Sequence, residues 1–308
     1  MINRLSKEPK MLKLYGNIIA NQEKRGFIEK VDVDINTNRR IHYIPHHAVK
    51  KDSLTTPIRI VYDCSCRESS DKASLNDCLM SVPPKINGLT GIIARFRLNK
   101  YAVSTDIEKA LLQIELDENN QDVTRFLWLS DSNDPNSPLI TYRFRVVLFG
   151  TTCSRFILNA TVLRHLKLNP SHTSNLLKND LYVDNVLSSF PDENSLISFY
   201  RESRSILSKG GFNLRSRTSN NIKLRQLTES EDCLEKGPTF KILGLRWDVE
   251  SDKLSFRNNI SFDIENTITK RDILSQSSSI FDPVSTRNTQ PNHRPCQNCY
   301  ADIMGRTI

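Results

Sequence analysis

Two aspartates, Asp106 and Asp184, are the residues of this chain best suited to metal chemistry. Residues 101–104 have the composition of a short buried strand that leads to Asp106, and a helical turn is expected to follow. Residues 181–187 are two short apolar runs around Asp184-Asn185, which predicts a β-hairpin with a strained tip. Together the two carboxylates could hold divalent ions roughly 3.5–4 Å apart for in-line attack on a phosphate. Because Asp and Asn are common turn residues, an ordinary hairpin turn is the alternative.

The sequence around these aspartates resembles motifs A and C of reverse transcriptases. Lys100–Leu116 corresponds to motif A and Leu181–Leu187 to motif C, and the 78 residues between the aspartates suit that pair. The surrounding blocks, over roughly residues 10–283, resemble the polymerase region of BEL/Pao LTR retrotransposons. The resemblance implies an α+β, right-hand polymerase fold with fingers and palm, in which an antiparallel palm sheet is backed by helices.

The same resemblance implies a metal site. Asp106, Asp184 and the backbone carbonyl of Ile107 would hold two Mg²⁺ ions, with Mn²⁺ as an alternative. Asp106, Asp184 and Asn185 would form the catalytic group. Asn185 stands where the family usually carries a second Asp. It offers an oxygen without a charge, which predicts weaker ion binding.

A strand expected over residues 56–64 carries the candidate triphosphate ligand, Arg59. By resemblance this guanidinium would meet the incoming nucleotide, because its planar fork matches phosphate oxygens. Lys50 or Lys51 would assist it; Lys51 is included among the substrate ligands, although the sequence does not choose between the two. They follow a Tyr-Ile-Pro-His-His-Ala-Val block at 43–49 that resembles Pao polymerases. A solvated strand face is the alternative for Arg59.

Residues 148–156 resemble motif B, and Gly150 within them would permit close backbone approach to a base pair. Leu148 and Arg155 replace two prolines of the family pattern. Leu111 stands where the family usually has the aromatic ring that excludes a ribose 2′-hydroxyl, which weakens the expected selectivity for deoxynucleotides. A helix over 152–168 is expected to follow, with an apolar stripe of Phe156, Ala160 and Leu163.

Other segments are assigned by local signals and by the resemblance. We expect helices over 9–25, a stretch ending at 97, and 192–209; strands over 123–129 and 139–148; a turn-rich linker over 64–90 that contains Ser-Leu-Asn-Asp at 74–77; motif D over 211–215; and a primer-gripping hairpin over 241–256. The predicted division is 1–99 for the N-terminal helix and fingers, 100–258 for the palm with inserted fingers elements, 259–283 for the start of the next Pao block, and 284–308 for a divergent, disordered tail.

Composition supports a phosphate-rich partner without demanding one. Lys and Arg outnumber Asp and Glu by 43 to 35, giving a formal charge of +8 and a pI near 9.1. Seven irregularly spaced cysteines and a polar, charged amino terminus predict an intracellular, cytoplasmic protein without a signal peptide. No apolar run approaches the ~20 residues of a membrane span. Two zinc interpretations are disfavoured: the pair His46-His47 has no Cys or Glu at ligand spacing, and the cluster His293, Cys296 and Cys299 lacks a fourth ligand.

Three functional hypotheses remain. The first is an RNA-directed DNA polymerase cut from a larger polyprotein, which would bind an RNA or DNA template with its primer and deoxynucleoside triphosphates. The second is a decayed, weakly active or inactive copy that keeps the fold and binds nucleic acid. The third is an unrelated basic binding module. Aspartic protease activity is rejected because no Asp-Thr-Gly or Asp-Ser-Gly occurs, and we expect neither an RNase H nor an integrase segment after residue 283.

Overall fold

The computed structural model describes residues 2–31, 40–50, 58–230, 237–256 and 270. Within these residues, helices and four antiparallel sheets confirm the α+β class expected from the sequence. The chain divides into two compact units: residues 1–85 with 109–164 form the first unit, and residues 86–108 with 165–308 form the second unit. The boundaries predicted at 99 and 258 stay predictions. Nearly all of the predicted segments 259–283 and 284–308, with the His293, Cys296 and Cys299 cluster, lies outside the described residues.

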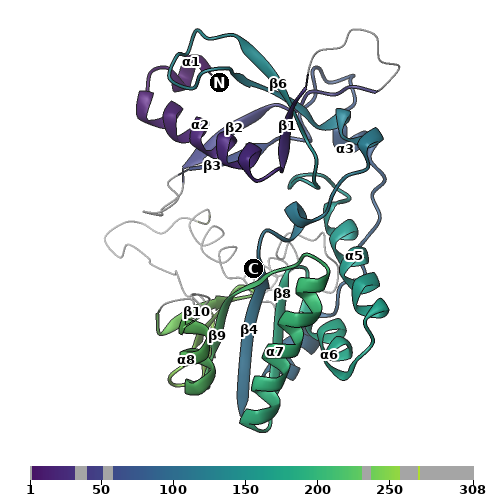
Figure 1. Cartoon of the computed structure of the whole chain (residues 1–308), viewed down its shortest axis with the longest axis vertical. Helices are drawn as coiled ribbons and strands as arrows, with labels where there is room; N and C mark the ends of the chain where they lie inside the picture. Colours follow the sequence, from purple (N-terminus) through teal and green to yellow (C-terminus); the bar gives the residue numbers. More distant parts are fainter. Residues whose placement is uncertain (1, 32–39, 51–57, 231–236, 257–269, 271–308) are drawn as a thin grey trace, which may run out of the picture. The chain divides into compact units, whose positions relative to one another are not determined.

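The first unit is built on helix α2 and two small sheets (Figure 1). One sheet has the order β1-β6-β5, and the other pairs β2 with β3. The strands are β1 (Ile28–Val31), β2 (His46–Lys50), β3 (Ile58–Tyr62), β5 (Arg125–Leu129) and β6 (Leu139–Phe144). The helices are α1 (Ile2–Leu5), α2 (Pro9–Lys24), α3 (Leu75–Cys78), α5 (Ser154–Leu168, whose last residues count with the second unit) and the 3₁₀ turns η1 (Ala110–Gln113), η2 (Glu118–Asn120) and η3 (Asp122–Thr124).

Local signals explain several of these elements. Pro9 opens α2, where its missing N–H would have had no helical partner, and the helix predicted over 9–25 is confirmed. Leu129 pairs with Leu139, so β5 and β6 form the hairpin predicted around a polar loop. Large rings then fill the core of the unit. Its largest fully buried side chains are Tyr15, Phe126, Trp128 and Phe144, which pack with aliphatic residues of α2 and β3.

The second unit holds a four-stranded antiparallel sheet with the order β7-β8-β4-β9. Its strands are β7 (Leu181–Tyr182), β8 (Asn185–Phe190), β4 (Tyr101–Ile107) and β9 (Leu214–Ser219). Helix α7 (Glu193–Lys209) contacts β8, β4 and β9, and in Figure 1 it runs alongside β4 and β8. The other elements are α4 (Leu89–Phe96), α6 (His172–Asp180), α8 (Ile222–Ser230) and the sheet of β10 (Thr239–Ile242), β11 (Leu245–Asp248) and β12 (Lys253–Ser255).

Most predicted elements of this unit are confirmed. The Asp192 side chain caps α7 by accepting from Ser195 N at 2.9 Å, as its acidic first turn predicts. The hairpin predicted over 241–256 is present as β10, β11 and β12. Phe96 of α4 packs edge-on against Trp247 of β11, with ring centroids 4.9 Å apart, so α4 and this hairpin share one apolar core with β4 and β8.

The stripe predicted for α5 is wrong. Phe156 and Ala160 are exposed, and the buried positions are Ser154, Leu158, Asn159, Val162 and Leu166. Both sets have helical spacing, so periodicity alone could not choose the face that packs. No helix of the described ranges has the length and apolar character needed to cross a membrane.

Candidate active site

The structure brings Asp106 and Asp184 together at one end of the second unit's main sheet. Strands β4 and β8 are antiparallel neighbours, and Asp106 lies directly opposite Asn185. The backbone N–H of Ile107 donates to the carbonyl oxygen of Asp184 at 2.7 Å. The hairpin tip is therefore fixed against the end of β4 by the backbone of the residue that follows Asp106. Both aspartates are half-buried.

The hairpin turn is one residue earlier than the sequence suggested. Tyr182 pairs with Asn185, so the two turn residues are Val183 and Asp184 rather than Asp184 and Asn185. Val183 has a φ of 57°, a left-handed conformation that is unusual for a β-branched residue. Because Asn185 pairs across to Asp106, Val183 must take the strained position that Asn would fill more easily. The strained tip is thus confirmed, while its exact residues were mispredicted.

Asn185 also contacts its neighbour through its side chain. Its amide Nδ2 donates a hydrogen bond to Oδ1 of Asp184 at 2.9 Å. One oxygen of Asp106, Oδ1, is buried. Within the described part of the chain, no three His, Cys, Asp or Glu side chains are grouped closely enough to hold a metal ion together. The donors at this sheet end are therefore two carboxylates, supplemented by the Asn185 side chain and backbone carbonyls such as that of Ile107, an all-oxygen set that suits Mg²⁺.

A third acidic side chain, Glu108, lies near the two aspartates and is bonded to residues of the next segment of the sheet. Glu108 follows Ile107, and its carboxylate accepts from Asn213 at 3.0 Å and from Arg215 at 3.3 Å. Arg215 belongs to β9, where it lies opposite Asp106 in the sheet. The segment predicted as motif D thus runs beside the segment predicted as motif A, and Glu108 links the two strands.

The β7–β8 hairpin is held in place by hydrogen bonds from residues that the sequence analysis did not single out. Asp180, buried at the end of α6, directly precedes the hairpin. Its carboxylate accepts from Arg95 Nε at 2.8 Å and from Ser188 Oγ at 2.6 Å. The Asn87 amide donates to the carbonyls of Lys178 and Leu181. Arg95 and Asn87 lie 85 or more residues from their partners, so only a charged residue next to an apolar run could have signalled this network.

The remaining predicted residues belong to the first unit. Arg59 is exposed on β3, opposite Val49, so the strand predicted over residues 56–64 is present from Ile58 to Tyr62. Lys50 is exposed on β2, and its Nζ lies 3.7 Å from a carboxylate oxygen of Glu8. Lys51 lies outside the described residues, so the choice between the two lysines stays open.

Gly150 and Leu111 occupy constrained positions in the first unit. Gly150 has a φ of 103°, and a Cβ built on it would lie 3.0 Å from the carbonyl oxygen of Tyr62. Glycine is therefore required there by the fold of the unit itself. Leu111, in η1, is only 6% exposed, so its side chain is part of a packed interior.

The comparisons with known proteins support the fold. No family model matches the chain, and no curated protein matches its sequence. The structure of the foamy viral protease-reverse transcriptase in complex with an RNA/DNA hybrid is similar, with a TM-score of 0.52 and 16% sequence identity. The match covers 77% of this chain and 26% of the viral chain. Over most of its length the chain is therefore similar in fold to this viral protein, and it spans about a quarter of the viral chain.

The histidine pair has a structural explanation. His46 Nε2 contacts the carbonyl of Leu127 at 2.9 Å, and its Nδ1 is hydrogen-bonded to the Tyr15 hydroxyl. Because a carbonyl only accepts, Nε2 carries the proton and Tyr15 donates to Nδ1. Burial lowers the pKa of His46 from its ordinary value of 6.5, although the bond to Leu127 opposes the shift. Both ring nitrogens are therefore used within the core, while the neighbouring His47 is exposed.

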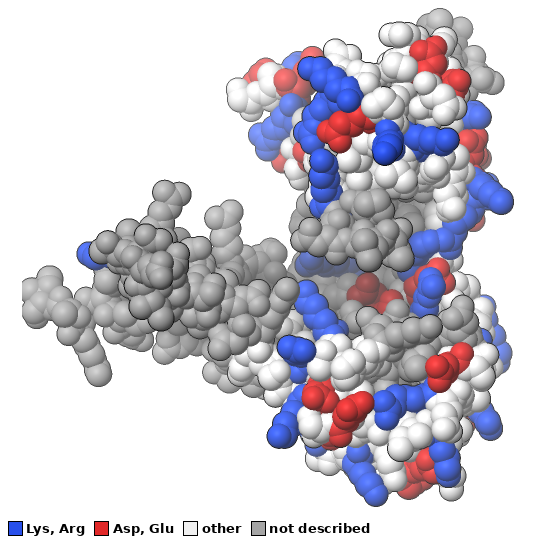
Figure 2. All heavy atoms as spheres, turned by 90° about the vertical axis from the view of Figure 1, so that its left-hand side faces the viewer, with Lys and Arg blue, Asp and Glu red and all other residues white. Residues whose placement is uncertain are grey.

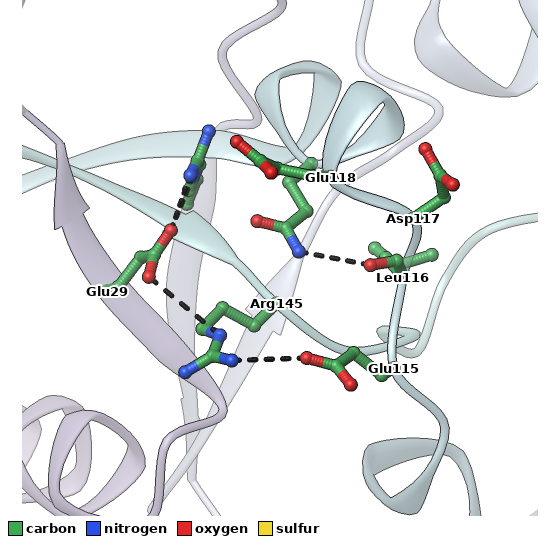
Figure 3. Close-up of a pocket in the computed structure, with 8 residues that line it drawn as sticks. Glu29, Glu115, Leu116, Asp117, Glu118 and Arg145 are labelled. Carbon is green, nitrogen blue, oxygen red and sulfur yellow. Dashed lines mark hydrogen bonds and ion pairs between the residues drawn. The ribbon is translucent and has the colours of Figure 1, made fainter.

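A pocket of about 700 Å³ in the first unit contains none of the predicted site residues (Figure 3). Its arginines are already paired: Arg145 lies 3.1 Å from Glu115 and 3.8 Å from Glu29, and Arg143 bonds to Glu29 at 2.7 Å. The remaining lining residues are Leu116, Asp117, Glu118 and Gln121. The pocket is thus lined by an ion-pair network, and we assign no chemistry to it.

Proposed function

We propose that this chain is the polymerase region of a BEL/Pao-type retrotransposon and catalyses RNA-directed DNA synthesis. The observation that carries the proposal is the placement of Asp106 and Asp184 at one sheet end, in a chain whose fold is similar to that of a reverse transcriptase. The right-hand polymerase architecture, the substrates and the metal ions are parts of this proposal.

The proposed reaction joins a deoxynucleotide to a primer. The 3′-oxygen of the primer attacks the α-phosphate of the incoming triphosphate, the bond to the β-phosphate oxygen breaks, and pyrophosphate leaves. Two Mg²⁺ ions bound by Asp106, Asp184 and the Ile107 carbonyl would activate the attacking hydroxyl and stabilise charge on the pyrophosphate. Asp106 is carried by the sheet and Asp184 by the hairpin tip, so both carboxylates would stay in position while substrates exchange.

Substrate binding is assigned to residues of the first unit. Arg59, with Lys50 or Lys51, would pair with triphosphate oxygens, and the Gly150 loop would lie against the nascent base pair. Template and primer would be held mainly through their phosphates and sugars, hence without sequence specificity. Figure 2 shows basic and acidic side chains interspersed on the visible face, so the net charge of +8 does not by itself locate the nucleic acid.

A second candidate is a chain that keeps the fold and binds nucleic acid but turns over poorly. Asn185 favours it, because the site has two carboxylates where the family usually has three, and the amide nitrogen is bonded to Asp184. Both candidates predict that the chain binds nucleic acid, and only the first predicts efficient nucleotide addition.

The test is primer extension by the purified chain on matched RNA and DNA templates, with Mg²⁺ and then with Mn²⁺. A binding assay on the same primer–template is run in parallel, and Asp106→Asn serves as the control for contaminating polymerases. Extension that needs metal and is lost in the control supports the polymerase. Binding without extension supports the second candidate, and the absence of both rejects the proposed function.

A further inference from the structure

Asn76 joins three segments of the first unit. It lies in the short helix α3, and its backbone N–H donates to the carbonyl of Cys64, just after β3. Its side-chain nitrogen donates to Ser65 Oγ at 2.8 Å and to the carbonyl of Gly150 at 2.9 Å. Its side-chain oxygen accepts from the backbone N–H of Thr152 at 2.9 Å. The bonds to Gly150 and Thr152 cross 74 and 76 residues of sequence.

The chemistry of these bonds selects an amide side chain. The loop presents a carbonyl at Gly150 and an N–H at Thr152, so its partner must both donate and accept. The Asn side chain has a donor, Nδ2, and an acceptor, Oδ1, on the same carbon atom. A carboxylate only accepts hydrogen bonds, and an aliphatic side chain neither donates nor accepts them. Gly150 and Thr152 are exposed, so the two bonds act by holding the loop in one conformation rather than by satisfying buried groups.

The loop is confined on its other sides as well. A Cβ at Gly150 would meet the Tyr62 carbonyl, so β3 and the loop are in close contact there. Ser154 Oγ donates to the carbonyl of Leu148 at 2.8 Å, which fixes the entry into α5. Arg59 lies on the same β3 strand. Asn76 therefore holds the predicted motif B loop against the end of the strand that carries the predicted triphosphate ligand.

Helix α3 does not need the Asn76 side chain for its own structure. Ser74 and Asp77 form a capping box, in which Ser74 N donates to Asp77 Oδ2 at 2.8 Å and Asp77 N donates to Ser74 Oγ at 3.3 Å. Arg67 adds an ion pair to Asp77 at 3.0 Å. The cap and the loop contact are thus separate interactions of neighbouring residues, and one can be removed without the other.

We propose that Asn76 is a positioning residue for nucleotide binding, acting through the Gly150–Thr152 loop. This inference rests on the proposed polymerase function and assigns a role to the Ser-Leu-Asn-Asp stretch at 74–77, which the sequence marked only as part of a linker. Loss of the side-chain bonds frees the loop beside the strand of Arg59. The nucleotide then binds less tightly, while the carboxylates of the second unit are unchanged.

The variants Asn76→Ala and Asn76→Asp are compared with Asp77→Ala, which removes the cap of the same helix but not the loop contact. In steady-state extension we expect both Asn76 variants to raise the KM for deoxynucleotides roughly tenfold with little change in kcat, the size of one or two net hydrogen bonds. Asp77→Ala should lower the melting temperature and leave the KM near the wild-type value. A wild-type KM in both Asn76 variants, or an equal rise in Asp77→Ala, overturns the inference.

Amide hydrogen exchange tests the loop contact independently of activity. Residues 150–153 should exchange fastest in Asn76→Ala, at an intermediate rate in Asn76→Asp, which keeps an acceptor for Thr152, and slowest in the wild type and Asp77→Ala. Unchanged exchange in Asn76→Ala contradicts the contact itself. If the wild type extends no primer and binds no nucleotide, the proposed function fails and the nucleotide role of Asn76 fails with it, while the exchange result still decides whether the contact exists.

Discussion

The side-chain amide of Asn185 donates a hydrogen bond to Oδ1 of Asp184 at 2.9 Å. Asn185 also lies opposite Asp106 in the sheet, so it is adjacent to both carboxylates of the candidate site. The bond orients the Asp184 carboxylate and uses one of its oxygens. Compared with an Asp at this position, Asn185 carries no charge, and its hydrogen bond stabilises the Asp184 carboxylate in the absence of metal.

Asn185→Asp should lower the Mg²⁺ concentration needed for half-maximal extension. In metal-free buffer the same change should destabilise the second unit, because the new carboxylate replaces the amide donor and faces the carboxylate of Asp184. Two like charges ~4 Å apart repel by about 1 to 4 kcal/mol, depending on the local dielectric. Mg²⁺ titrations of extension and of thermal unfolding measure both effects. Asn185→Ala is the comparison, since it removes the donor without adding charge. Superimposed titration curves for Asn185→Asp and wild type would mean that residue 185 is only a structural residue.

Asp106→Asn and Asp184→Asn should each abolish nucleotide addition while the fold stays stable. Both carboxylates are assigned to metal binding, and neutralising one reduces their mutual repulsion. Extension assays beside melting curves decide the matter. Glu108→Gln is the matched control, because Glu108 is an acid of the same segment that is bonded to Arg215 and Asn213. Wild-type extension by either aspartate variant would rule out the site assignment.

Leu111→Phe should sharpen discrimination against ribonucleotides at a cost in stability. An aromatic ring narrows the space beside the sugar's 2′ position, and a shape contact of this kind decides ~1–3 kcal/mol. Leu111 is only 6% exposed, so the larger ring must also repack its surroundings, which typically costs ~1–3 kcal/mol. The ratio of ribo- to deoxynucleotide incorporation and a urea unfolding curve are measured together. If Leu112→Phe, one residue further in the same turn, changes the ratio equally, position 111 does not face the sugar.

The stability of the first unit should fall as the pH drops below about 6.5. Burial lowers the pKa of His46, so between 6.5 and its lower folded value the unfolded chain binds the proton and the folded unit does not. The contribution of neutral His46 to the stability of the first unit is complete above pH 6.5 and is lost as the pH falls through the pKa of His46 in the folded unit. The sequence has two tryptophans, and Trp128 in the Trp247→Phe background reports on this unit alone. His46→Phe should flatten the pH dependence, whereas His47→Phe, at an exposed position, should retain it.

The sequence predicts well those helices, strands and turns that are determined by residues close together in the chain. The Asp192 cap, the Pro9 start and the apolar runs around the hairpin each act within a few residues, and the helices and strands they predict are present. The turn register failed because the pairing of Asn185 with Asp106 outweighs the turn preference of Asn. The contacts of Asp180 with Arg95 and of Asn76 with Gly150 join residues 85 and 74 positions apart, and no local pattern encodes them.

Val183→Gly should stabilise the hairpin while reducing activity. Val183 has a φ of 57°, which for a residue with a side chain costs roughly 1–2 kcal/mol. Glycine removes that strain, although its greater freedom in the unfolded chain offsets roughly 0.5–1 kcal/mol. We therefore expect a net gain of about 0.5–1 kcal/mol in the free energy of unfolding of the second unit.

The same flexibility should loosen Asp184, the next residue of the turn, and lower the extension rate. The matched control is Val186→Gly in the same hairpin. Val186 is buried in β8, so that change should destabilise by more than about 2 kcal/mol through lost burial and added chain entropy. Denaturant unfolding followed by Trp247 fluorescence, with Trp128→Phe in the background, measures both variants, and primer extension measures the rate. If Val183→Gly destabilises the unit as Val186→Gly does, Val183 contributes packing rather than strain. If it stabilises the unit and leaves extension unchanged, the strained tip has no part in positioning Asp184.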